Sequence, residues 1–73
     1  MFEKGLDIKV MLLKLGLSQV WLMARLRERG ITIQKAEMSR ILNGIQNGEK
    51  ADLILSKSVE ILDDYEAWMR VRS

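Results

Sequence analysis

Apolar residues recur along the chain with the spacing of one face of an α-helix, in segments of helical length. Gly30 and Gly44 each follow such a segment, where a left-handed glycine commonly closes a helix. No segment alternates between apolar and polar residues as a half-buried strand does. The pattern predicts an all-α fold, a compact bundle of about five short helices. These helices are expected at residues 6–15, 19–29, 35–43, 49–62 and in a short stretch that contains Tyr65, Trp68 and Met69.

The starts of the second and third helices are marked by capping positions. Ser18 is a good N-cap, because its hydroxyl can accept a hydrogen bond from a free backbone N–H of the first turn. Leu17 and Leu22 occupy the two positions that pack together as a hydrophobic staple around this cap. Gln34 stands at the same place before the third helix and is a poorer cap.

The third predicted helix has two different faces. At 100° per residue, Ile41, Leu42 and Ile45 lie within about 60° of Met38 and are expected to be buried. The opposite side is small, polar and basic, which suits a helix that enters the major groove of DNA. There Arg40 would bind guanine and Ser39 would donate to either kind of base. The same face also fits the solvent side of an ordinary amphipathic helix.

The composition narrows the classes of function. The 73 residues suffice for one domain, 1–73, with a thin core. Cysteine and histidine are absent, so disulfides, the commonest general base and the commonest metal ligands are excluded. We expect no enzyme, no metal, no cofactor and no small-molecule ligand. No apolar run reaches the ~18 residues of a membrane span, and charges interrupt the apolar N-terminal stretch, so a cytoplasmic protein without a membrane partner is expected.

Charge is distributed unevenly along the chain. Residues 9–50 contain eight Lys and Arg and three Glu, a net charge of +5, whereas residues 51–73 contain three basic and five acidic residues, a net charge of −2. A basic segment beside an acidic tail suits a protein that places one face on phosphates. Ordinary solvated helix surface explains the same numbers.

Two short stretches carry a family resemblance. Gly-Leu-Ser-Gln at 16–19 and Ser-Arg-Ile-Leu-Asn-Gly at 39–44, with the core residues between them, resemble the helix-turn-helix of lambda-repressor-type proteins. That group includes phage repressors, Cro proteins and XRE-type bacterial regulators. The resemblance spans residues 6–62, with the helix-turn-helix at about 18–44. It implies a small Cro-like repressor that binds a pseudo-palindromic DNA operator as a homodimer.

The resemblance also implies roles for individual residues. Gln19 would bind phosphate and brace the recognition helix, 35–43. Lys35, Ala36, Ser39 and Arg40 would occupy the base-reading positions. Asn43 would contact the DNA backbone just past them, and Gln46 and Lys50 would lie near the flanking phosphates. The remaining DNA-contacting candidate is Gln34, next to the recognition helix.

The chain departs from the family pattern between the two helices. Gln19 and Asn43 are 24 positions apart, more than is usual in the family, and the surplus falls at 27–32. This lengthened turn either brings Arg27 and Arg29 to the DNA backbone or is an insertion that costs little entropy.

Two apolar features leave a second function open. Val20 and Trp21 lie off the core face of their helix, so they either pack within the chain or form a partner surface. Tyr65, Trp68 and Met69 either close the core or make the contact between the subunits of a dimer. Both features favour the alternative function, a protein-interaction module such as an antitoxin or antirepressor.

Overall fold

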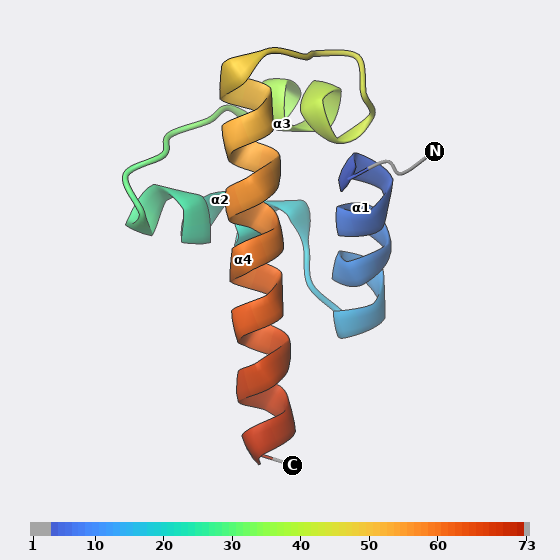
Figure 1. Cartoon of the computed structure of the whole chain (residues 1–73), viewed down its shortest axis with the longest axis vertical. Helices are drawn as coiled ribbons and strands as arrows, with labels where there is room; N and C mark the ends of the chain where they lie inside the picture. The colour runs from blue at the N-terminus through green and yellow to red at the C-terminus, as the bar shows by residue number, and fades with distance from the viewer. Residues whose placement is uncertain (1–3, 73) are drawn as a thin grey trace.

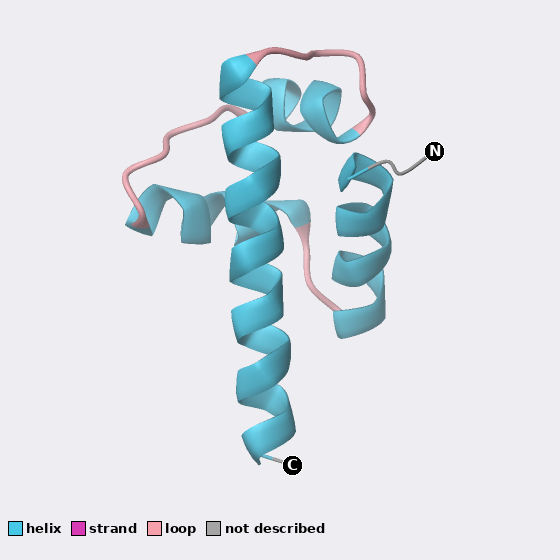
Figure 2. Ribbon diagram, in the orientation of Figure 1, coloured by secondary structure: helices cyan, strands magenta, loops and turns pink. Residues whose placement is uncertain are grey.

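The computed structural model describes residues 4–72, and all regular structure in that range is α-helical, as predicted (Figure 2). The elements are α1 (Lys4–Leu15), α2 (Gln19–Glu28), α3 (Lys35–Leu42) and α4 (Glu49–Arg72). Figure 1 shows α4 along the length of the molecule, with α1 beside it, α2 crossing behind it and α3 above α1. α3 lies near the start of α4, so the last turns of α4 extend away from it.

The described range contains four helices rather than five, because the predicted break before Tyr65 does not occur. Residues 49–72 form one helix of 24 residues that includes Trp68 and Met69. The segment contains no glycine or proline, and its Asp63-Asp64 pair lies exposed on the helix surface instead of ending it. Neither α4 nor any other helix of residues 4–72 has the long apolar stretch that a membrane-spanning segment requires.

Of the two predicted N-caps, Ser18 makes a side-chain capping bond and Gln34 does not. The Ser18 hydroxyl accepts a hydrogen bond from the backbone N–H of Trp21 at 3.0 Å and so caps α2. Gln34 has extended backbone angles before α3 but makes no side-chain capping bond. The start of α3 therefore depends on its packing against the core rather than on its cap.

Gly44 ends α3, and the turn that follows leaves Ile45 outside the core. Gly44 has φ of 75°, and the backbone N–H of Ile45 donates to the carbonyl of Arg40 at 2.9 Å, which closes the helix in a Schellman motif. Gly30 closes α2 in the same way. Because the chain turns at Gly44, Ile45 leaves the helical face of Met38 and is 70% exposed. The prediction that Ile45 is buried was wrong.

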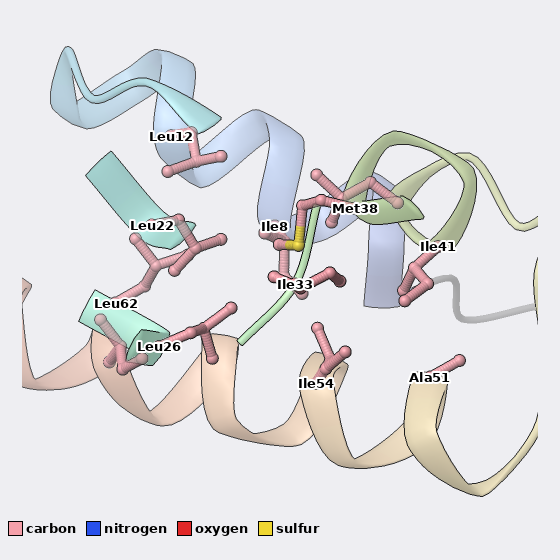
Figure 3. Packing of buried hydrophobic residues seen from close by; sticks show 12 residues of the cluster. Ile8, Leu12, Leu22, Leu26, Ile33, Met38, Ile41, Ala51, Ile54 and Leu62 are labelled. Atoms are coloured by element: carbon pink, nitrogen blue, oxygen red, sulfur yellow. The ribbon is translucent and has the colours of Figure 1, made fainter. Parts of the chain in front are cut away.

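The core draws on all four helices and the α2–α3 loop (Figure 3). Its twelve buried apolar residues are Ile8, Leu12, Leu22, Leu26, Ile33, Met38, Ile41, Leu42, Ala51, Ile54, Ile61 and Leu62. Burial of Met38, Ile41 and Leu42 confirms the rest of the predicted apolar face of α3. That burial fixes which side of α3 is turned outward.

Candidate nucleic-acid interface

The face of α3 that was predicted to read DNA is open to solvent. Lys35, Ala36 and Arg40 are exposed and Ser39 is half-buried, whereas Met38 and Ile41 on the other side are 0% and 1% exposed. Gln34 is exposed directly before the helix.

A side-chain network links α3 to the start of α4. The half-buried Glu37 carboxylate accepts hydrogen bonds from Gln46 Nε2 at 2.9 Å and from Lys50 Nζ at 3.1 Å. Arg40 Nε in turn donates to Gln46 Oε1 at 3.2 Å. Gln46, which was predicted near the phosphates, is therefore bonded to Arg40, and Lys50, predicted there too, joins the same network through Glu37.

The network lowers the pKa of Glu37 below its ordinary value, chiefly through the hydrogen bond from Gln46 and then through that from Lys50. A carboxylate with a lowered pKa stabilises the fold at pH above its ordinary value, and this contribution is lost as the pH falls through the lowered pKa. We expect Gln46→Ala to raise the pKa of Glu37, measured by NMR titration of its side-chain carboxyl carbon. Asn47→Ala, in the same loop, is the matched control and should leave that pKa unchanged. An equal rise in both variants would contradict the network.

Asn43 joins the end of α3 to α1. Its Nδ2 donates to the carbonyl of Ser39 at 2.9 Å, and its Oδ1 accepts from Lys9 Nζ at 2.6 Å. Lys9 lies 34 positions away in sequence and was not among the predicted site residues. Only the packing of α1 against α3 brings it there, so no local pattern could have found it. Glu37 was missed for a similar reason, because its partners lie beyond the helix that contains it.

Gln19 begins α2 and is half-buried. Its Nε2 is buried and has no hydrogen-bond partner within residues 4–72, so this amide group does not brace α3 in the free protein. A buried donor without an acceptor costs about 1–3 kcal/mol. A phosphate contact by Gln19 stays a prediction and would require the amide to rotate outward.

The lengthened turn is anchored toward α4. Ile33 is buried and Ile31 is half-buried, which fixes the middle of the connection to the core. Arg29 Nη2 lies 3.6 Å from Asp64 Oδ2, and both side chains remain substantially exposed. Of the two arginines predicted to reach DNA from this turn, Arg29 is thus drawn to α4, while Arg27 is exposed.

Aromatic side chains connect α2 to the second half of α4. Trp21 packs edge-on against Tyr65 with ring centroids 5.2 Å apart, which confirms that Trp21 finds its cover within the chain. Tyr65 is half-buried by this contact and also lies 5.9 Å from the ring of Trp68. Trp68 and Met69 remain 51% and 42% exposed, and Val20 is 59% exposed.

No family model, curated protein or solved structure matches the chain. The resemblance to lambda-repressor-type proteins therefore stays a prediction that rests on the residues quoted above. Within residues 4–72, no cluster of carboxylates has the arrangement that could hold a metal ion.

Proposed function

We propose that this protein binds double-stranded DNA sequence-specifically, as a small Cro-like repressor with α3 in the major groove. The observation that supports this most is the convergence of basic side chains from three helices around the exposed face of α3. Lys9 of α1 reaches α3 through Asn43, Lys50 of α4 reaches it through Glu37, and Arg40 lies between them on α3. Basic side chains that come from several helices and surround one helix can contact the phosphates on both sides of the groove that this helix enters.

In this proposal the side chains divide into two roles. Lys35, Ala36, Ser39 and Arg40 face the base edges, with Arg40 donating to guanine. Lys9, Gln19, Gln34, Asn43, Gln46 and Lys50 contact the sugar-phosphate backbone, which sets the register of α3 but reads no bases. Gln46 restrains Arg40 through the bond to Nε, so the terminal guanidinium nitrogens stay available for a bidentate contact.

The proposed function is tested by binding to a library of randomised duplexes, with the bound fraction sequenced at several salt concentrations. A pseudo-palindromic motif is expected, with a log–log salt slope of about −0.9 for each phosphate contact. No enrichment and no binding at low salt would exclude the proposal.

Replacing Arg40 with alanine tests the role of α3 directly. We expect Arg40→Ala to weaken binding to the preferred site by about 1–3 kcal/mol and to relax the preference at one base position. Arg70→Ala is the control, because Arg70 lies near the end of α4 that is far from α3 (Figure 1). Equal losses on every sequence would instead make Arg40 a phosphate contact.

The exposed Trp68 and Met69 favour a second candidate function, a protein-interaction module of the antitoxin or antirepressor kind. A stable complex with another protein, together with absent or salt-insensitive DNA binding, would distinguish this function from the first. Tyr65, Trp68 and Met69 stay the tail candidates for a homodimer contact, with Tyr65 packed against Trp21 of its own chain and the other two more exposed.

A further inference from the structure

α1 is apolar on two opposite faces, and only one of them is covered. Ile8 and Leu12 are buried in the core at 1% and 6% exposure. Leu6, Val10 and Leu13 form a stripe on the opposite side and are 52%, 53% and 83% exposed. A helix with apolar residues on both sides is typically buried on both. In Figure 1, α1 lies at the edge of the molecule, and no other helix of residues 4–72 lies on its outer side.

We propose that a second copy of this chain packs on this outer face of α1, with the two α1 helices antiparallel about a twofold axis near Val10. Leu6 of each copy then lies opposite Leu13 of the other, and the two Val10 side chains meet at the axis. The inference deepens the proposed function and rests on it in one respect, namely that a dimer suits a pseudo-palindromic operator.

In this arrangement an acidic side chain beside the stripe of one copy meets a basic side chain of the other copy. At 100° per residue, Asp7 and Lys14 lie on one flank, roughly 70–95° from the centre of the stripe. When two identical helices pack antiparallel about a twofold axis, the same flank of each helix lies on the same side of the pair. Asp7 of each copy therefore faces Lys14 of the other. Both side chains are exposed, and neither forms an ion pair within residues 4–72. An acid and a base at this spacing favour the twofold pairing over a partner of unrelated charge.

The other flank of α1 is the one that meets α3. Gly5 lies against the backbone of Leu42, and Lys9 binds Asn43, both at roughly 65–110° from the centre of the stripe. The twofold axis is perpendicular to α1 and to the line between the two helices, so it keeps this flank on one side of the dimer. Both α3 helices therefore lie on the same side of the dimer, as binding to one duplex requires.

The expected dimer is weak in the absence of DNA. α1 has 12 residues and is about 18 Å long, so one such helix pair buries less than the roughly 1,200 Å² of a stable interface. The two Lys9 side chains also approach one another on the α3 flank, and operator phosphates would relieve their repulsion. Dimerisation should thus be visible at high protein concentration and be strengthened by the operator.

The test is sedimentation equilibrium of the full chain without DNA, from micromolar to millimolar concentration. The mass should rise from that of the 8.4 kDa monomer toward twice that value. Leu13→Glu should stay monomeric throughout, because it places a charge at the contact while altering a side chain outside the core. Val71→Glu is the matched control, since Val71 is similarly exposed at 86% near the end of α4, and should still dimerise. A monomeric wild-type chain at millimolar concentration, or loss of the dimer in the control alone, would overturn the inference.

Exchanging the two charges gives a second readout that nonspecific association cannot produce. Asp7→Lys and Lys14→Asp should each abolish the dimer, and the double variant should restore it, with helix content checked by circular dichroism. Failure of the double variant to recover while folded would contradict the antiparallel pairing. Because no DNA is present, these results are independent of whether the chain binds an operator.

Discussion

Gly5→Ala is expected to destabilise the protein by about 1–3 kcal/mol, although replacing glycine by alanine inside a helix ordinarily stabilises it by about 0.5–1 kcal/mol. A Cβ at Gly5 would overlap the carbonyl oxygen of Leu42 and lie 2.9 Å from the carbonyl carbon. Both atoms belong to the backbone, so no side-chain rotation relieves the overlap. Either the first turn of α1 unwinds or α1 moves away from α3.

Urea unfolding followed by circular dichroism measures this cost. Lys4→Ala is the matched control, since Lys4 is the exposed neighbour in the same turn and should change stability by no more than about 0.5 kcal/mol. A Gly5→Ala variant as stable as the wild type would show that α1 and α3 do not approach as closely as the structure has it. A displaced α1 would also withdraw Lys9 from Asn43, so under the proposed function DNA binding should weaken in Gly5→Ala beyond what unfolding explains.

The sequence predicted those features of the fold that depend on neighbouring residues in the chain. The cap at Ser18, the left-handed glycine at Gly44 and the buried side of α3 each depend on a few adjacent residues, and all three were predicted. Ile45 shows the limit of such reasoning. A projection at a constant angle assumes that the helix continues, whereas Gly44 had already ended it.

The candidate site depends more on tertiary packing than its own helix suggests. The exposed residues of α3 follow from the periodicity, but the Lys9–Asn43 and Glu37–Lys50 contacts join residues whose spacing carries no signal. Continuity of α4 through Asp63 and Asp64 was also hidden, because a carboxylate pair is compatible with a helix surface and with a junction. Neighbours from other elements decide the two contacts, whereas α4 continues through the carboxylate pair because its segment contains no glycine or proline.

Met38→Ala is expected to have the largest effect on stability, a loss of about 2–5 kcal/mol. Met38 is 0% exposed, and Figure 3 shows its side chain directed into the cluster that contains Ile8 and Ile33. A chain this small has a thin core, so such a loss removes much of its total stability. α3 has eight residues and no side-chain cap, so it has little stability of its own once this anchor is removed.

Ile45→Ala provides the sharpest comparison, because the helical projection places Ile45 on the same face as Met38. Its side chain is 70% exposed, and its loss should cost no more than about 0.5 kcal/mol. Urea unfolding compares the two variants, and amide hydrogen exchange tests whether α3 opens before the remaining helices in Met38→Ala. Equal destabilisation by the two substitutions would mean that the helix continues past Gly44. A large difference, with early exchange confined to α3, would show that the exposed face of α3 is held in place by burial of its opposite side. Under the proposed function, Met38→Ala should then lose DNA affinity even where most of the protein is folded.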